Sequence, residues 1–334
     1  MKRSQMVRLL TVGVFLVLFL RIEIERGTSC PTGPLLPSPH GRIGIYLTSY
    51  ALLKPGVLDK ALQAVEAGRL NALVINVKNN LGEVTYASRV SLAKEIGAST
   101  RRLNLASLLP TLRAKGIYLI ARQVVFYDPK FAAYLGDTDS PWVPPNDRQA
   151  VQYNLAIAQE VASLGFDELQ FDYLRFPDEG PLIPSYEDHY QAVNQFLQQA
   201  RQLLSGKITL SVDVFGRVLW DWNKKRIDPI GQSLEDMTTY VDLISPMLYP
   251  SHYNESYYQQ DPYRVVQEAL SCGKARVTTP YRPFLQAFDR AIPAGMRLED
   301  YIRAQIRAAQ DAGADGYLFW DPSCDYTALY KALD

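Results

Sequence analysis

The chain has 334 residues, no formal net charge at pH 7, and an ordinary globular composition of 47% hydrophobic and 21% charged residues. A chain of this size and composition fits one large folded domain. The neutral balance argues against a nucleic-acid-binding protein, which usually carries a basic stripe.

The first 29 residues differ in character from the rest. Basic residues precede an apolar run of 12 residues, from Leu9 to Leu20. This run is short for a membrane span and has the length of a signal-peptide core. Charged residues follow it in place of a small-residue cleavage site. We therefore expect residues 1–29 to be an export signal that can persist as a membrane anchor, with attachment through residues 6–24. The protein is expected outside the cytoplasm, either secreted or anchored facing the extracytoplasmic side.

A Pro-rich segment, residues 30–41, is typical of a linker. From residue 42 to 334, short apolar runs alternate with helical patterns. The predicted strands are 42–48, 72–78, 117–125, 168–174, 208–216, 241–249, 275–282 and 316–321. The predicted helices are 55–69, 105–116, 148–165, 186–206, 261–273 and 298–314. This alternation predicts an α/β fold, a (β/α)8 TIM barrel. A doubly wound open sheet is the alternative, but no Gly-x-Gly-x-x-Gly turn follows the first strand.

The alternation of apolar residues predicts which strand residues face the barrel interior. Every second side chain of a barrel strand points inward, and the others must be apolar because they pack against helices. The polar residues expected inside are Asn76, Lys78, Arg122, Gln170, Asp172, Ser211 and Asp213. The charged ones lie nearest the carboxyl ends of their strands, which form the catalytic face of such barrels. Buried polar groups are unfavourable unless they are paired or used, so these residues predict a site.

Two carboxylates at this face predict glycoside hydrolysis. Asp172 and Asp213 end neighbouring strands, and paired carboxylates are the usual machinery of that reaction. We expect Asp172 to be the ionised nucleophile or base and Asp213, with a raised pKa, to be the acid. Asp321, after the last strand, is the alternative acid. A structural salt bridge from Asp172 to Arg122 or Arg175 is the competing interpretation.

Aromatic and cationic side chains gather at the same strand ends and predict a sugar-binding cleft. The candidate substrate-binding residues are Tyr46, Lys78, Arg122, Tyr173, Arg175, Tyr249, Tyr281 and Trp320. Trp142 is expected near the rim. Asp178 and Glu179 are expected on a solvated loop, and Glu83 is a weaker catalytic candidate.

Other chemistries have little support. The three cysteines form no Cys-x-x-Cys pair, and the three histidines form no His-Glu-x-x-His pattern. No Gly-x-Ser-x-Gly elbow or phosphate-binding loop occurs. We therefore expect neither a metal nor a cofactor.

Four segments carry a resemblance to a known family. They are "ALVINVKNNLGEVTYAS", "GFDELQFDYLRFP", "LSVDVFG" and "LISPMLYPSHY". Together they resemble the bacterial putative glycoside hydrolase domain family marked by an FDY-x-RFP segment, over roughly residues 43–330. The resemblance implies a TIM-barrel glycosidase whose partner is an extracellular or envelope polysaccharide. It carries that family's motif residues onto Asp172, Arg175 and Asp213.

One segment departs from the family pattern. The family's second-strand segment commonly reads IDVKDD, whereas this chain has INVKNN, so Asn76, Asn79 and Asn80 replace acids while Lys78 is kept. This departure implies altered specificity or weaker activity. The alternative function is therefore a non-catalytic carbohydrate-binding or envelope polysaccharide assembly protein on a degenerate barrel. The intact Asp172 and Asp213 favour the enzyme.

Overall fold

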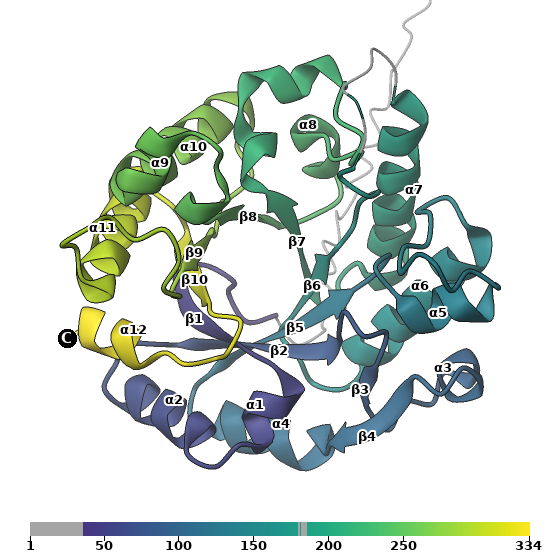
Figure 1. The fold of residues 1–334 in the computed structure, drawn as a ribbon. Coiled ribbons are helices and arrows are strands. Elements are labelled where there is room, and N and C mark those ends of the chain that lie inside the picture. Colours follow the sequence, from purple (N-terminus) through teal and green to yellow (C-terminus); the bar gives the residue numbers. More distant parts are fainter. Residues whose placement is uncertain (1–35, 180, 182–185) are drawn as a thin grey trace, which may run out of the picture. The chain divides into compact units, whose positions relative to one another are not determined.

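Eight parallel strands close into a barrel in the computed structural model, which describes residues 36–179, 181 and 186–334 (Figure 1). The barrel strands are β1 (Arg42–Leu47), β2 (Ala72–Lys78), β5 (Tyr118–Val124), β6 (Glu168–Asp172), β7 (Thr209–Phe215), β8 (Leu243–Leu248), β9 (Phe284–Gln286) and β10 (Gly316–Trp320). Strand β1 pairs with both β2 and β10, which closes the ring. The predicted TIM barrel is confirmed.

Helices surround the barrel in Figure 1 and connect its strands. The longer ones are α2 (Val57–Glu66), α4 (Leu105–Ala114), α6 (Arg148–Ala162), α7 (Glu187–Leu204), α10 (Pro262–Arg276) and α11 (Leu298–Asp311). The shorter ones are α1 (Ser49–Leu53), α3 (Ser91–Glu95), α5 (Pro129–Tyr134), α8 (Leu234–Met237), α9 (Ser256–Gln260), α12 (Thr327–Ala332) and the 3-10 turns η1 (Gly216–Leu219), η2 (Asp221–Lys225) and η3 (Pro250–His252). Asp147 begins α6 by accepting a hydrogen bond from the Ala150 amide at 2.7 Å, the usual role of an N-cap aspartate. Within the described part of the chain, no helix combines the length and hydrophobicity needed to cross a membrane.

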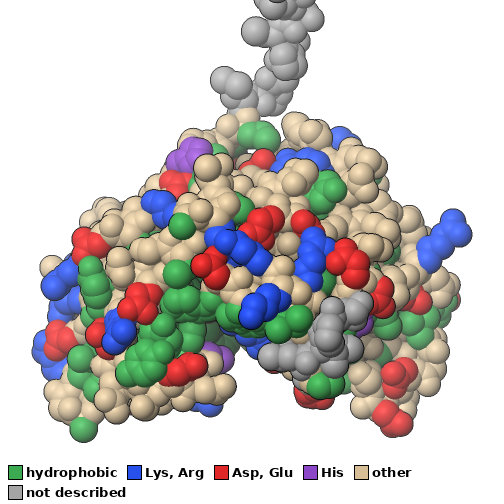
Figure 2. Space-filling view, turned by 90° about the horizontal axis from the view of Figure 1, so that it is seen from above, with side chains coloured by type: hydrophobic (Ala, Val, Ile, Leu, Met, Phe, Trp, Pro, Cys, Tyr) green, Lys and Arg blue, Asp and Glu red, His purple; other side chains and the backbone are tan. Residues whose placement is uncertain are grey.

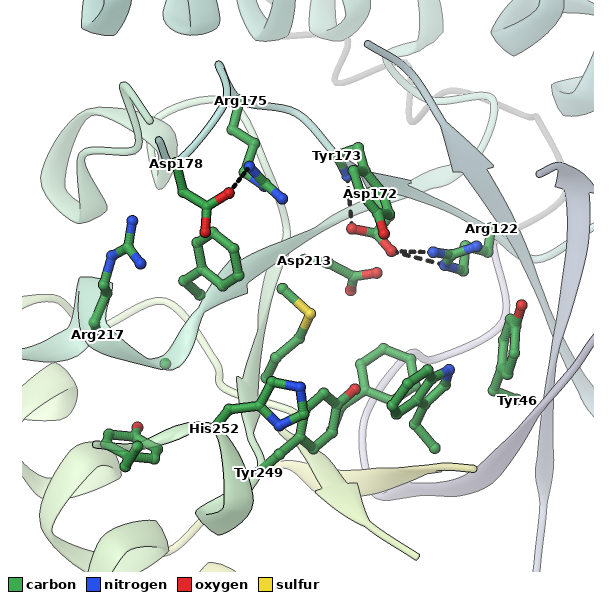
Figure 3. Close-up of a pocket in the computed structure, with 16 residues that line it drawn as sticks. Tyr46, Arg122, Asp172, Tyr173, Arg175, Asp178, Asp213, Arg217, Tyr249 and His252 are labelled. Carbon is green, nitrogen blue, oxygen red and sulfur yellow. Dashed lines mark hydrogen bonds and ion pairs between the residues drawn. The ribbon is translucent and has the colours of Figure 1, made fainter. Parts of the chain in front are cut away.

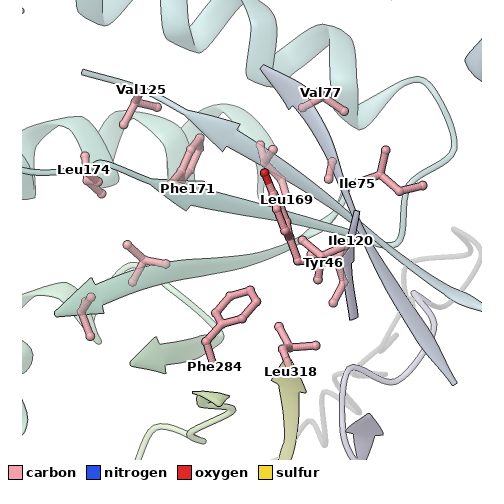
Figure 4. Close-up of a cluster of buried hydrophobic side chains, with 14 of the residues drawn as sticks. Tyr46, Ile75, Val77, Ile120, Val125, Leu169, Phe171, Leu174, Phe284 and Leu318 are labelled. Atoms are coloured by element: carbon pink, nitrogen blue, oxygen red, sulfur yellow. The ribbon is translucent and has the colours of Figure 1, made fainter. Parts of the chain in front are cut away.

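Buried hydrophobic side chains lie inside the barrel, as Tyr46 and Phe284 do, and between the strands and the helices (Figure 4). Leu169 and Phe171 of β6 are fully buried on the outer side of the barrel. Phe171 packs edge-on against Phe196 of α7, with ring centroids 5.2 Å apart. Burying such side chains stabilises the fold by about 1.5–3 kcal/mol each. This arrangement fixes the phase of β6 as predicted and turns Gln170 and Asp172 inward.

The barrel interior is polar along much of its length. Glu168 and Arg282 form a fully buried ion pair inside the barrel. Glu168 also accepts a hydrogen bond from the Tyr118 hydroxyl at 3.1 Å. One layer further along β6, Gln170 donates to Ser245 at 3.1 Å. Because most of these buried groups are paired, the polar interior is compatible with a stable barrel.

Two predictions on the strands are wrong. The seventh barrel strand is Phe284–Gln286, whereas it was predicted at residues 275–282. Helix α10 continues to Arg276, and Pro280 and Pro283, which lack an amide hydrogen, leave little room for pairing before Phe284. Two further strands were not predicted, β3 (Val84–Tyr86) and β4 (Ser99–Leu103), which extend the sheet beyond β2.

The described residues form one compact unit from Leu36 to Asp334. The predicted export signal at residues 1–29, and residues 30–35 of the predicted linker at 30–41, lie outside the described residues. Acidic and basic side chains are interspersed over the face seen in Figure 2. This face therefore carries no broad field of one sign.

Candidate active site

A cavity of about 340 Å³ opens at the carboxyl ends of the barrel strands (Figure 3). Eight residues predicted from the sequence line it: Tyr46, Arg122, Asp172, Tyr173, Arg175, Asp213, Tyr249 and Trp320. They come from strands far apart in the sequence, which the closure of the barrel brings together. The cavity therefore lies where the strand phase predicted a site.

Asp172 is fixed in position by an ion pair and a backbone hydrogen bond. Its Oδ2 accepts a hydrogen bond from Arg122 Nε at 2.8 Å and forms a salt bridge with Nη2 of the same guanidinium. Its Oδ1 accepts from the Tyr173 amide at 2.6 Å. Charge-assisted bonds of this kind are strong and directional, and they fix the orientation of the carboxyl group.

A chain of hydrogen bonds supports this pair from the neighbouring strands. Arg122 Nη1 donates to Asn76 Oδ1 at 2.8 Å, and Asn76 Nδ2 donates to the Tyr46 hydroxyl at 2.7 Å. Asn76 thus faces inward, as predicted, and orients the guanidinium that holds Asp172. The amide acts here as a positioning group between β1 and β5.

Asp213 meets different surroundings although it lies on the adjacent strand. Its side chain is 2% exposed, and its Oδ1 has no hydrogen-bond partner among the described residues. Burial and the negative charge of Asp172 raise the pKa of Asp213 well above its ordinary value, although Arg122 opposes the shift. Asp213 therefore holds its proton more readily than a solvent-exposed aspartate does.

Tyr173 has an unusual backbone conformation next to Asp172. Its φ of 53° lies in the left-handed region, which is uncommon for a large side chain and is often found at functional sites. This turn aims the Tyr173 amide at Asp172. The Tyr173 ring lies 5.1 Å from the ring of Tyr127 and 5.8 Å from that of Trp142. These three aromatic residues form one wall beside the cavity.

A second aromatic wall lies across the cavity. Tyr249 stacks on Trp320 with ring centroids 5.3 Å apart. Burial, followed by the charges of Asp213 and Asp172, raises the pKa of Tyr249. Its hydroxyl therefore stays protonated beside the two carboxyl groups. Aromatic faces of this kind suit the apolar faces of sugar rings.

Lys78 is not in this site, so the prediction that it faces the barrel interior is wrong. The register between β2 and β5 shifts after Asn76, which is a β-bulge. The bulge turns Lys78 toward the helices. There its Nζ lies 2.7 Å from Asp128 Oδ2 and 5.5 Å from the Tyr153 ring.

Tyr281 is also absent from the cavity. Since β9 begins at Phe284, Tyr281 precedes the strand and lies toward its amino end. Its carbonyl accepts a hydrogen bond from the Asp315 amide, just before β10, at 2.7 Å. Its ring is buried, with the hydroxyl near Gly273 of α10. The prediction of a substrate contact depended on the misplaced strand.

Asp321 lies beside the cavity and does not line it. It lines an adjoining hollow of about 790 Å³ that shares Trp320 and His252 with the cavity. Its Oδ1 accepts from the Ser323 amide at 2.7 Å, which fixes the turn after β10. The position of Asp321 favours this turn-stabilising role over that of the acid.

Two residues that depart from the family pattern, Asn79 and Asn80, and the weaker catalytic candidate Glu83 lie outside the cavity. Asn79 accepts hydrogen bonds from the Leu81 and Glu83 amides at 3.0 Å and shapes the turn after β2. Asn80 is exposed. Glu83 pairs with Arg102 at 2.7 Å. Of the three replaced acids, only Asn76 therefore contacts a residue that lines the cavity.

Three polar residues of the cavity were not predicted to be part of the site: Asp178, Arg217 and His252. Asp178 was expected on a solvated face. Its side chain is 43% exposed, but it lines the cavity and accepts a hydrogen bond from Arg175. Arg217 follows β7 within the turn η1, and His252 follows β8. In the sequence, the position of Arg217 and His252 shortly after the ends of predicted strands was the feature that could have identified them as site residues.

Within the described ranges, no group of three or more metal-ligating side chains could hold a metal ion.

Comparisons with known proteins agree with this architecture. A family model described as putative glycosyl hydrolase domain matches residues 44–326. The glycoside hydrolase domain of PgaB (BpsB) from Bordetella bronchiseptica is 15% identical, with a TM-score of 0.62 over 88% of this chain and 99% of that one. An endo-1,4-β-mannanase from Rhizomucor miehei is 10% identical, with a TM-score of 0.62 over 86% of this chain and 88% of that one.

A hypothetical protein from Ruminiclostridium thermocellum is more similar in sequence, at 32% identity. It aligns with a TM-score of 0.44 over 51% of this chain and 97% of its own. No curated protein matches the sequence significantly.

Proposed function

This chain belongs to the family of putative glycosyl hydrolase domains, and we propose that it hydrolyses a polysaccharide with Asp172 and Asp213 as its carboxylate pair. The contrast between these two groups carries the proposal. Asp172 is paired with a guanidinium, whereas Asp213 is buried without a partner for its Oδ1 among the described residues. Paired carboxyl groups with separated protonation states are the requirement of glycoside hydrolysis.

In the proposed reaction, Asp213 donates its proton to the glycosidic oxygen as the bond from that oxygen to the anomeric carbon breaks. The leaving sugar departs as an alcohol. Asp172 either attacks the anomeric carbon or takes a proton from the water that attacks it. In both routes water supplies the hydroxyl of the new reducing end. In the nucleophilic route the remaining proton of this water goes to Asp213 and restores it, whereas in the other route it goes to Asp172, and proton exchange with solvent then returns both carboxyl groups to their starting states.

The substrate is proposed to be an extracellular or cell-envelope polysaccharide. The aromatic walls on both sides of the carboxyl groups support a chain of sugar rings as the ligand. The basic and then apolar pattern at residues 1–29 supports an exported protein, either secreted or anchored. Detecting the full-length protein in the extracytoplasmic or culture fraction tests the location, and recovery in the cytoplasm alone would contradict it.

The first test compares the full chain with its Asp172→Asn and Asp213→Asn variants on a panel of envelope and secreted polysaccharides. New reducing ends are counted. We expect cleavage by the parent and a loss of about 10²–10⁴-fold in Asp213→Asn, the usual contribution of general acid catalysis. Asp59→Asn, on the exposed side of α2, is the matched control and keeps full activity. Equal activity in parent and both variants would exclude this pair.

The anomeric configuration of the first product, followed by NMR, separates the two roles proposed for Asp172. Retention assigns it as the nucleophile and inversion as the base.

A non-catalytic carbohydrate-binding protein is the second candidate function. Asn76 favours it, because an amide occupies the interior position where the related family commonly has an acid. Binding of a glycan by the parent without release of reducing ends would support this candidate.

A further inference from the structure

Two guanidinium groups share one aromatic ring at the edge of the cavity. Arg175 Cζ lies 4.5 Å from the ring centroid of Phe215, and Arg217 Cζ lies 4.7 Å from it. Both arginines line the cavity, and Arg175 and Arg217 are labelled on the same side of the view in Figure 3. Stacking on an aromatic ring holds a guanidinium in place while its edge remains able to donate hydrogen bonds.

Both arginines keep unused donors. Arg175 Nη1 donates to the Phe176 carbonyl at 3.1 Å and to Asp178 at 3.2 Å. Arg217 donates to Asp228 through Nε at 2.9 Å and Nη2 at 3.1 Å. Among the described residues, no acceptor faces Arg175 Nε, Arg175 Nη2 or Arg217 Nη1.

The carboxylate already present is a weak partner for Arg175. Asp178 contributes one long contact, and its side chain is 43% exposed. An ion pair of this kind contributes little to stability, and water screens it. Another anion that offers two oxygens in a plane would bind Arg175 better.

The three arginines of the lining differ in how firmly their carboxylate partners hold them. Arg122 pairs with Asp172, and Arg217 pairs with the buried Asp228. Arg175 has only the partly exposed Asp178. The unused donors of Arg175 and Arg217, rather than a net charge of the cavity, therefore favour an anionic ligand.

We infer that the Phe215 side of the cavity is a subsite for an anionic substituent of the glycan, a carboxylate or a sulfate, bound by Arg175 and Arg217. This inference rests on the proposed function, because it names the substrate class of the same site. The acidic sugar would lie on one side of the carboxyl pair. The Tyr249 and Trp320 wall lies on the other side and would bind the next ring.

The test measures equilibrium binding of the full chain by calorimetry. The probes are oligogalacturonate with its carboxyl-reduced neutral form, and a sulfated galactan oligomer with its desulfated form. We expect at least one anionic probe to bind about tenfold or more tightly than its neutral form, with the preference decreasing as salt increases. Whichever pair shows the preference identifies the anion. Equal binding of both forms, or no binding of either anionic probe, would overturn the inference.

Variants with opposite expected effects separate a subsite from a structural cluster. Arg217→Gln should abolish the preference, whereas Arg264→Gln, on the exposed side of α10 where Arg264 pairs with Glu268 at 2.8 Å, should keep it. Asp178→Asn should increase affinity for the anionic probe several-fold, because it removes the competing carboxylate. Unchanged or weaker binding by Asp178→Asn would mean that the Arg175–Asp178 pair is only structural.

The subsite and the proposed function fail in distinguishable ways. A binding preference without any release of reducing ends keeps the subsite and contradicts the glycosidase. Cleavage of neutral and anionic polymers at equal rates keeps the glycosidase and contradicts the subsite.

Discussion

At the scale of single residues, the site depends on placing one carboxyl group where its charge is unfavourable. Asp172 has a guanidinium and a backbone amide as partners. Asp213 lies near Asp172, and its Oδ1 has no hydrogen-bond partner among the described residues. Such a group destabilises the folded state whenever it is ionised, which is typical of residues retained for catalysis rather than for stability.

Asp213→Asn is therefore expected to stabilise the protein at neutral pH, by on the order of 1 kcal/mol. Because folding raises the pKa of Asp213, the folded state keeps a proton that the unfolded state has released. The stability of the parent thus decreases as pH increases from about 4, the ordinary pKa of aspartate, to the raised pKa. The asparagine variant lacks this dependence. Urea unfolding between pH 4 and 8 measures the free energy of unfolding of both proteins. The difference between Asp213→Asn and the parent should be smallest at pH 4 and increase with pH.

Asp167→Asn is the matched control for a buried carboxylate with partners. Asp167 is 3% exposed, pairs with Arg113 at 2.6 Å and accepts from the Leu119 amide at 2.8 Å. Its substitution should destabilise the protein by about 1–3 kcal/mol. Destabilisation by Asp213→Asn of similar size would show that Asp213 is also stabilised as an anion.

At the scale of elements, the bulge in β2 separates two polar residues that alternation would have placed together. Asn76 stays inside with Arg122, and Lys78 turns outward to Asp128. The pair contributes to the packing of β2 against α5 and α6, because Asp128 also caps α5 by accepting from the Phe131 amide at 2.9 Å.

Lys78→Met is expected to destabilise the protein by about 3–5 kcal/mol, because it leaves a buried carboxylate without its cation. The double variant Lys78→Met/Asp128→Asn should recover much of this loss, since asparagine also caps helices well. Chemical unfolding of the parent and the variants measures both effects. Because Lys78 does not reach the cavity, the KM of folded protein should not change. A higher KM with unchanged stability would restore the sequence-based prediction of a substrate contact.

The bulge also shows what the sequence could not reveal. Long alternating segments such as residues 168–172 and 209–215 gave the correct strands and the correct inward residues, because their apolar side must face the helices. Register between strands is a property of two segments, so the shift after Asn76 left no pattern within β2. Strand β9 has only three residues, Phe284–Gln286, which is too short for any alternation to appear.

At the scale of the whole molecule, the polar residues of the barrel interior form successive layers that end at the candidate site. The Glu168–Arg282 pair lies deepest, Gln170 and Ser245 follow along the strands, and the Asp172–Arg122 pair is at the mouth. The inner layers pair their charges, whereas the outermost layer leaves Asp213 without a cation of its own. Sequence phase predicted this outer layer. It did not predict Arg282 or Arg217, because Arg282 belonged to the misplaced strand and Arg217 lies in a turn.

The position of this layer depends on closure of the barrel between β10 and β1. Gly316 begins β10 opposite Arg42, with a φ of 83°, and a Cβ atom there would lie 2.1 Å from the Arg42 carbonyl oxygen. Gly316→Ala should therefore lower the free energy of unfolding by more than about 3 kcal/mol, because the alanine is strained in the left-handed conformation and its Cβ atom clashes with rigid backbone. Gly295→Ala is the control, because Gly295 has a φ of 82° and a Cβ atom there would have no neighbour within 4 Å, so it should lose about 1–2 kcal/mol. Thermal and urea unfolding of the two variants measure the difference. Equal losses would mean that backbone strain alone accounts for Gly316, and that the close contact between β10 and β1 does not hold the barrel shut.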